Sequence, residues 1–135
     1  AHRVLACLER NDVARPRGPR GKRLQVLEGA LAMIQGNPSD APGTLQLATA
    51  MGVSRRTLEN AFRDGLGVSP AAYLKARRLC GLARDLYHGD DGSVQVAELA
   101  RDHSFHHLGQ LAADYRAMFG ELPTVTLKRG RANIT

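Results

Sequence analysis

The stretch LATAMGVSRRTLENAFRDGLGVSP, residues 47–70, decides the fold that this sequence predicts. Its first part contains Ala48, whose small side chain lets two helices approach closely, and a tight turn follows. Ser54 then stands where a helix N-cap is expected, because its hydroxyl can accept a hydrogen bond from an unsatisfied backbone N–H. Leu58 and Phe62 follow at helical spacing, which predicts a second helix with one buried face. A short helix, a tight turn and a second helix make a helix-turn-helix.

This pattern occurs twice, about 53 residues apart. From Leu58 onward the offset is 53 and before it 52, so the second copy has one additional residue in its turn. Glycine favours a sharp turn because it adopts positive φ at little cost, and the second copy has Ser104 where the first has Gly52. The first copy comprises Ala48, Gly52, Leu58, Phe62, Leu66, Gly67 and Pro70, and the second Ala100, Ser104, Leu111, Tyr115, Phe119, Gly120 and Pro123. The repeat predicts two helix-turn-helix units in one chain.

Apolar residues at helical spacing predict further helices around both copies. The helix before the first copy carries Leu24, Leu27, Leu31 and Ile34. A long helix runs from the Ser69 cap and Pro70 to about Tyr87, with Tyr73, Leu79, Leu82 and Leu86 on its buried side. Short helices are expected from a Thr44 cap to Ala50, from a Ser93 cap to about Asp102, and from near His107 to Phe119. No segment alternates long enough for a strand, so we expect an all-α fold of about seven helices, with two helix-turn-helix subdomains joined by a long linker helix.

Composition divides the chain into three parts. Residues 1–23 are expected to form an N-terminal segment and a basic interdomain linker, because Arg15–Arg23 is rich in Pro, Gly and like charges. Residues 24–127 form the double helix-turn-helix domain, and residues 128–135 a basic tail. Within the domain, the first unit spans about 44–67, the linker helix about 69–87 and the second unit about 93–120.

The charge balance favours a polyanionic partner. Nineteen Lys and Arg against thirteen Asp and Glu give a formal charge of +6, which suits nucleic acid. No apolar run approaches the roughly 20 residues of a membrane span, and no signal peptide opens the chain. Two cysteines, Cys7 and Cys80, indicate a reducing cytoplasm and no structural disulfide. We expect a cytoplasmic protein without membrane contact, and the abrupt opening at Ala1 indicates a fragment of a longer one.

Both copies resemble a known family. The first reads Leu47-Ala48-x-x-x-Gly52-Val53-Ser54-x-Arg56-Thr57-Leu58-x-x-x-Phe62, followed by Leu66-Gly67-x-Ser69-Pro70-x-x-Tyr73-Leu74-x-x-x-Arg78-Leu79. The second reads Phe105-x-His107-Leu108-Gly109-Gln110-x-Ala112-x-Asp114-Tyr115-Arg116-x-x-Phe119-Gly120-Glu121-Leu122-Pro123. Residues 24–127 are similar to the DNA-binding domain of the AraC/XylS regulators, and the second copy to the branch with XylS-like activators and regulators of ethanolamine use.

This resemblance implies sequence-specific binding of double-stranded DNA by the C-terminal domain of a bacterial transcription regulator, an effector-responsive activator of a catabolic operon. It also implies an upstream effector-binding or dimerisation domain, which this chain lacks, and RNA polymerase is a candidate further partner. We expect the chain to bind as a monomer through two adjacent major-groove segments, roughly 34 Å apart. The alternative that the residues leave open is a helical protein-interaction module without sequence-specific DNA binding.

The helix after Ser54 carries the best candidates for base recognition. With Leu58 and Phe62 buried, Arg56, Asn60 and Arg63 share the opposite, exposed side. Arg pairs bidentately with guanine and Asn with adenine, and Glu59 can accept from cytosine amino groups. The resemblance implies base reading at Arg56 and Asn60 as well. Three residues at the helix start are expected to contact phosphate, Ser54, Arg55 and Thr57.

The second recognition helix is expected to read less sequence than the first. Leu108, Gly109, Ala112 and Ala113 line much of its expected reading surface. Gln110 is its best candidate reader and has few polar neighbours to fix its orientation. His106 and His107 are candidate phosphate contacts, although His107 can also serve as a helix cap. A metal site at His103, His106 and His107 is disfavoured, because no cysteine or carboxylate set stands at ligand spacing. No cofactor is expected.

Two other classes of function have weak support in the sequence. An enzyme would need a catalytic base, a Gly-rich phosphate loop or an oxyanion site near its reactive groups. The sequence places none of these beside Asp90, Asp91 or Cys80, so we expect no enzymatic activity. Tyr73, Tyr87 and Tyr115 are expected to be buried or half-buried, so no aromatic platform is available to stack single-stranded bases.

Overall fold

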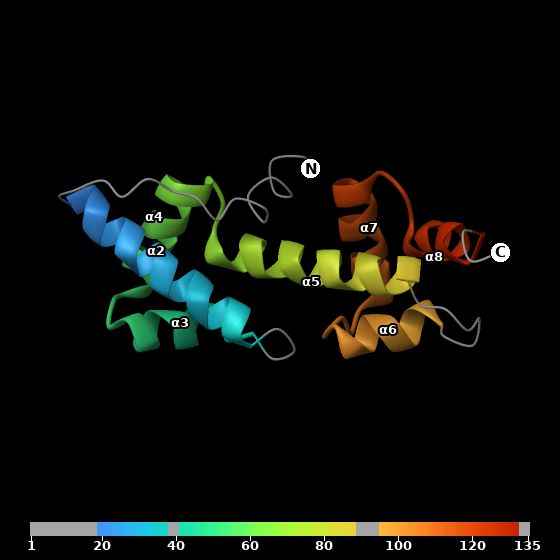
Figure 1. Ribbon diagram of the computed structural model, residues 1–135, viewed down its shortest axis with the longest axis horizontal. Helices are drawn as coiled ribbons and strands as arrows, with labels where there is room; N and C mark the ends of the chain where they lie inside the picture. The colour runs from blue at the N-terminus through green and yellow to red at the C-terminus, as the bar shows by residue number, and fades with distance from the viewer. Residues whose placement is uncertain (1–18, 38–40, 89–94, 133–135) are drawn as a thin grey trace. The chain divides into compact units, whose positions relative to one another are not determined.

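The computed structural model describes residues 19–37, 41–88 and 95–132 (Figure 1). Within these ranges it contains seven helices and no strand, so the all-α prediction is confirmed. The helices are α2 (Pro19–Gly36), α3 (Thr44–Met51), α4 (Arg55–Leu66), α5 (Pro70–His88), α6 (Val96–Asp102), α7 (Leu108–Phe119) and α8 (Pro123–Ala132). Cys7, Asp90 and Asp91 lie outside the described residues.

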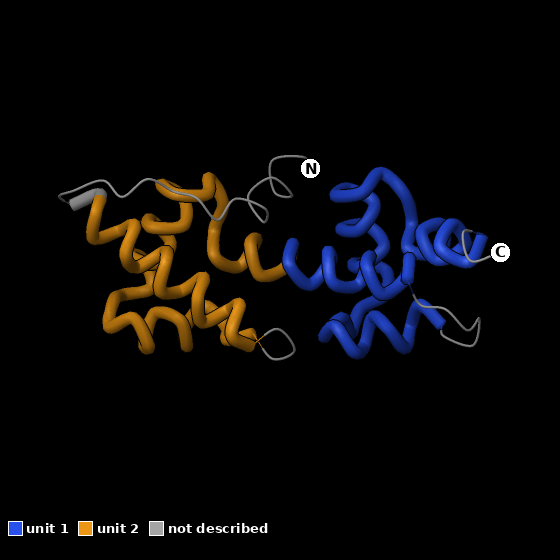
Figure 2. The backbone as a smooth tube through the Cα atoms, in the orientation of Figure 1, with its two compact units in different colours: residues 1–3, 76–135 blue, residues 4–75 orange. Residues whose placement is uncertain are grey.

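The chain divides into two compact units within α5 (Figure 2). The N-terminal unit, unit 2 in the figure, ends at Lys75, and the C-terminal unit, unit 1 in the figure, begins at Ala76. Each unit has its own hydrophobic core, and the expected linker helix contributes to both: Tyr73 is buried in the first core, and Leu79 and Leu86 in the second. The long helix is therefore an integral part of each unit.

The core of the N-terminal unit forms where α2, α3 and α4 meet. The α2 stripe behaves as its spacing predicts, since Leu24, Leu27 and Ile34 are buried and Leu31 is half-buried. The other buried members are Ala30, Leu47, Ala48, Leu58, Ala61, Phe62 and Tyr73. The Phe62 and Tyr73 rings meet edge to face with their centroids 5.7 Å apart, a favoured geometry for aromatic pairs.

The core of the C-terminal unit contains a polar chain beside its apolar residues. Tyr115 is fully buried, and its hydroxyl donates to Thr126 Oγ1 at 2.7 Å, which in turn donates to Glu121 Oε1 at 2.7 Å. The Arg129 guanidinium donates to the same carboxylate oxygen at 2.6 Å. The hydrogen bond from Thr126, together with Arg129, lowers the pKa of Glu121 below its ordinary 4.5, whereas burial raises the pKa of Tyr115. These bonds join α7, the turn after it and α8.

The internal repeat is longer than the sequence pattern indicated. At an offset of 52, buried positions of α2 correspond to buried positions in the second part of α5. The pairs are Leu24 with Ala76, Leu27 with Leu79, Ala30 with Leu82, and Ile34 with Leu86. Each copy therefore begins with one more helix, α2 in the first and the second part of α5 in the second. Helix α5 both ends the first copy and begins the second.

The structure corrects both ends of the predicted domain. The predicted linker is wrong for Pro19–Arg23, because α2 begins at Pro19; proline is tolerated at the first helical position, where its missing N–H has no helical partner. The predicted basic tail is wrong up to Ala132, because α8 continues to that residue and buries Thr126, Leu127 and Gly130.

Two predicted caps are also wrong. Gly43, rather than Thr44, is the N-cap of α3, and its backbone N–H donates to Gln46 Oε1 at 2.9 Å. Gln95 is the N-cap of α6, so this helix begins after the predicted Ser93, which lies outside the described residues. In both cases the prediction chose a nearby residue with a hydroxyl group, because such residues are preferred N-caps. The actual N-caps, Gly43 and Gln95, have no hydroxyl.

Candidate nucleic-acid interface

The turn of the N-terminal unit has the predicted geometry. Gly52 has φ +66°, the left-handed region that favours glycine, and the Val53 N–H donates to the Ala48 carbonyl at 3.1 Å. Ser54 caps α4 as expected, since its Oγ accepts from the Thr57 N–H at 3.1 Å. The turn and the cap together fix where α4 begins.

The solvent side of α4 carries the predicted base readers. Leu58, Ala61 and Phe62 are buried on the core side. At 3.6 residues per turn, Arg56, Asn60 and Arg63 lie on the opposite side. Both arginines are exposed, and Asn60 and Glu59 are partly exposed. Three side chains able to hydrogen-bond base edges therefore share one accessible face.

An ion pair on α4 links a predicted phosphate contact, Arg55, with a predicted base reader, Glu59. Arg55 Nε lies 3.4 Å from Glu59 Oε1, one helical turn apart, and the Arg55 side chain is 70% exposed. Such exposed pairs contribute little to stability. They do restrain where the carboxylate points. At the helix start, the hydroxyls of Ser54 and Thr57 lie 2.9 Å apart, beside the exposed backbone of the first turn.

The turn of the C-terminal unit repeats the positive φ of the first turn at a different residue. Ser104 has φ +65° and, within the described residues, is the one non-glycine with positive φ. Its carbonyl accepts from Arg78 Nη1 at 3.4 Å, and the Arg78 guanidinium lies over the Phe105 ring, 5.1 Å from its centroid. His103 Nε2 lies 2.6 Å from Asp85 Oδ2. Side chains of α5 therefore hold the turn that precedes α7.

The solvent side of α7 differs from that of α4. Leu111 and Tyr115 are buried, and Leu108, Gly109, Gln110 and Ala113 are exposed. The expectation that Gln110 has few polar neighbours to fix its orientation is wrong, because its Nε2 donates to Asp114 Oδ1 at 3.0 Å, one turn along the helix.

The two predicted histidine contacts lie at the start of α7. His106 and His107 are both exposed. His107 occupies the N-cap position of α7 and makes no capping hydrogen bond with its side chain.

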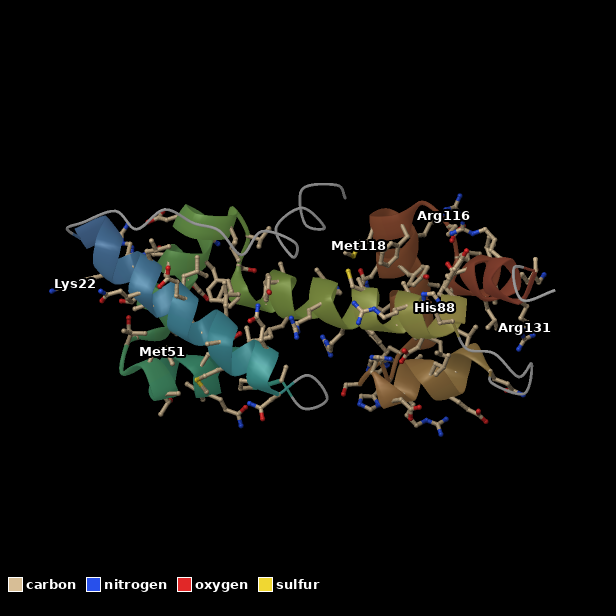
Figure 3. All side chains as sticks on the ribbon, viewed as in Figure 1. Lys22, Met51, His88, Arg116, Met118 and Arg131 are labelled. Atoms are coloured by element: carbon tan, nitrogen blue, oxygen red, sulfur yellow. The ribbon has the colours of Figure 1, made fainter. Side chains whose placement is uncertain are left out.

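Sequence reasoning missed one exposed cation on α7. Arg116 corresponds to Arg63 at the offset of 53, and both residues are exposed (Figure 3 labels Arg116). The carbonyls of both accept the N–H of the glycine that ends their helix, Gly67 at 3.0 Å and Gly120 at 2.8 Å. Extending the repeat one position beyond Tyr115 would have found it.

The described residues contain neither a candidate metal site nor a candidate membrane span. Among the parts of the chain that the structure describes, no three His, Cys, Asp or Glu side chains gather closely enough to hold a metal ion. In those same parts, no helix is long and apolar enough to cross a membrane.

A family model and solved structures of regulators match this chain. A family model described as a helix-turn-helix domain matches residues 47–129. A solved structure of a probable AraC family transcriptional regulator from Rhodopseudomonas palustris is 33% identical, covers 79% of this chain and 98% of its own, and superposes with a TM-score of 0.72. A Chromobacterium violaceum regulator at 24% identity shares the fold, with a TM-score of 0.68 over 78% of this chain and 92% of its own.

Two curated regulators are similar to this chain in sequence. The XylDLEGF operon transcriptional activator of Pseudomonas putida is 34% identical over 66% of this chain and 28% of its own length. The probable thc operon regulatory protein of Rhodococcus erythropolis is 29% identical over 93% of this chain and 38% of its own. The chain thus spans about a third of the length of these relatives.

The fold, with its two helix-turn-helix units, and the family match define a DNA-binding transcription regulator. The chain belongs to the AraC/XylS family.

Proposed function

We propose that α4 and α7 enter the major groove of duplex DNA and that the N-terminal unit reads most of the sequence by hydrogen bonds. The observation that carries this proposal is the shared solvent face of Arg56, Asn60 and Arg63, opposite the buried side of α4. These are the side chains that discriminate guanine and adenine in the major groove. On α7, the hydrogen-bonding group that we assign to base reading is Gln110.

The remaining polar residues have supporting roles. Glu59 accepts from a cytosine amino group. Its ion pair with Arg55 offsets the negative charge of the carboxylate, which would otherwise repel nearby phosphates. Phosphate contacts come from the residues that flank the two helix starts, where backbone N–H groups also point outward. These residues are Ser54, Arg55, Thr57, His106 and His107.

The whole protein, we propose, is an effector-responsive activator of a catabolic operon that acts in the cytoplasm. Its curated relatives are named as operon regulators and are much longer than this chain. Effector binding and dimerisation would belong to a further domain of the protein, and contact with RNA polymerase would follow once the DNA is bound.

Selection of bound duplexes from a random pool tests sequence-specific binding. We expect one preferred sequence, bound more tightly than its scrambled version at a single salt concentration. The fixed salt concentration matters because phosphate contacts alone make affinity salt-dependent. Equal affinity for the selected and scrambled duplexes would leave a non-specific or protein-binding module, and the proposal would be wrong.

A further inference from the structure

The reading face of α7 is apolar where that of α4 is polar. At the offset of 53, Arg56, Glu59 and Asn60 of α4 correspond to Gly109, Ala112 and Ala113 of α7. Leu108, the first residue of α7, is 51% exposed. We call Leu108, Gly109 and Ala113 the apolar patch, since all three are exposed. Burying such a patch against another surface is favourable, because it removes apolar area from water.

The surroundings of the apolar patch suit a polyanion that has apolar groups on its surface. Arg116 on the same helix is exposed, as are His106 and His107 before it. The nearest acid on α7, Asp114, accepts from the Gln110 amide. Basic and neutral polar groups thus flank the patch, and the one carboxylate of α7 is hydrogen-bonded.

We propose that the apolar patch reads thymine through its 5-methyl group. Thymine alone presents a methyl group in the major groove, and apolar side chains distinguish it from the other bases by contact with that group. This inference rests on the proposed entry of α7 into the major groove. It assigns the C-terminal unit a different chemistry of recognition, apolar contact in place of hydrogen bonds.

The position of Leu108 suits this role. The N-terminal residues of a recognition helix are those that meet base edges, and Leu108 opens α7. Gly109 follows without a side chain, so the backbone of this turn can approach a base closely. Ala113 lies one to two turns further along and offers a methyl-sized surface. Gly109 and Ala113, four residues apart, share one side of α7, and Leu108 lies beside them at the start of the helix.

Deoxyuridine tests the proposal, because it differs from thymidine only in lacking the 5-methyl group. Each thymine of the selected duplex is replaced singly, and binding of the unaltered chain is titrated. We expect at least one thymine whose replacement weakens binding about fourfold, the effect of losing one buried methyl-sized group. In Leu108→Ala the same replacement should have almost no further effect, since the two changes remove the same contact.

Two variants serve as matched controls. Leu45 on α3 is 72% exposed and lies outside α7, so Leu45→Ala should keep the full deoxyuridine penalty. Arg56→Ala should lower overall specificity and keep the same penalty, because it lies on the other recognition helix.

The outcomes separate this inference from the proposed function. If no duplex is preferred over its scrambled version, the proposed function fails and the thymine reading fails with it. If a preferred duplex exists but no thymine responds to deoxyuridine, or the penalty persists unchanged in Leu108→Ala, sequence-specific binding stands and the thymine reading is overturned. A preferred duplex without thymine would also overturn it.

Discussion

The two units bury matching positions and differ in the chemistry that fills them. Where Phe62 meets Tyr73 in the N-terminal unit, Tyr115 donates a hydrogen bond to Thr126 in the C-terminal unit. Tyr115 and Thr126 follow Phe62 and Tyr73 by 53 positions each. The same contact is therefore an aromatic pair in the N-terminal unit and a hydrogen bond between two hydroxyls in the C-terminal unit. On the solvent side, the polar face of α4 corresponds to an apolar one on α7.

This difference shows what the helix-turn-helix requires of its sequence. Ala48 and Ala100 are both buried, and Gly67 and Gly120 both have positive φ after their helices. Those positions are fixed by close packing and by backbone conformation. The exposed positions carry no such constraint, so the solvent sides of α4 and α7 can diverge.

The largest expected effect is on the stability of the C-terminal unit. In Gly130→Ala, the new Cβ would lie 2.1 Å from the Tyr87 carbonyl oxygen, so α8 must move away from the end of α5. We expect the unfolding free energy to fall by about 3 kcal/mol, the upper range for overpacking a tight contact. Native-state hydrogen exchange of the α7 and α8 amides measures this loss of unfolding free energy.

Gly109→Ala is the matched control for this substitution. A Cβ at Gly109 meets no atom within 4 Å, and alanine favours a helix over glycine. The N-terminal unit should keep its protection in both variants. Equal loss of protection in α2 and α4 would mean that the two units unfold together, and the comparison between separate units would not hold.

The second expected effect is on DNA binding. Arg56→Ala and Asn60→Ala should each cost about 1–3 kcal/mol for the selected duplex and relax preference at one or two base pairs. Gln110→Ala should cost less, because one N–H of its amide already donates to Asp114. Arg55→Ala should weaken binding to all sequences alike, as loss of a phosphate contact does.

Titration of the selected and scrambled duplexes with each variant, at one salt concentration, makes this comparison. Folding of each variant is checked by circular dichroism. If Gln110→Ala removed more sequence preference than Arg56→Ala, the N-terminal unit would not be the main reader.

A reciprocal exchange at the two turns should have opposite effects. Ser104 has φ +65° and Gly52 φ +66°, and a left-handed conformation costs a non-glycine residue about 1 kcal/mol or more. Ser104→Gly should therefore stabilise the C-terminal unit by about 1 kcal/mol, and Gly52→Ser should destabilise the N-terminal unit by a similar amount. Urea unfolding followed by hydrogen exchange assigns each change to its unit. Destabilisation by Ser104→Gly would show that the serine side chain makes a compensating contact.

The smallest expected effect depends on pH. The folded-state pKa of Glu121 is lowered, chiefly by the hydrogen bond from Thr126, so its ionised form stabilises the C-terminal unit above about pH 4.5. This contribution is lost as the pH falls through the folded-state value. Glu121→Gln should therefore be less stable than the unaltered chain at pH 7 and equally stable at strongly acidic pH.

The N-terminal unit supplies the internal reference for this titration. Its matching residue is Val68, which packs against an apolar core. Protection of α2 and α4 should therefore not differ between Glu121→Gln and the unaltered chain at any pH. A constant difference in α7 and α8 at every pH would indicate that the charge of Glu121 contributes nothing.

The sequence by itself determined the helix-turn-helix units and the face of α4. Ser54 and Ser69 cap their helices as predicted, with Oγ accepting at 3.1 and 3.2 Å, and Gly52 adopts the positive φ that its turn requires. These signals act within one turn of the chain, so they can be recognised without knowing the fold. The exposed side of Arg56 and Asn60 follows from helical periodicity alone. Even the bond from Gln110 to Asp114 was within reach, because residues four apart on a helix are neighbours.

Only the tertiary structure decided how α5 is shared, where the domain ends and what holds the second turn. Tyr73 and Leu79 lie on one amphipathic helix, and no local pattern assigns them to different cores. The contact of Arg78 with the Ser104 carbonyl spans 26 residues, and that of His103 with Asp85 spans 18. Helix α8 has a basic sequence that favoured a tail, yet it packs because Gly130 lets its backbone reach Tyr87. Each of these features depends on which residues distant in sequence come together, and packing, rather than local propensity, sets that.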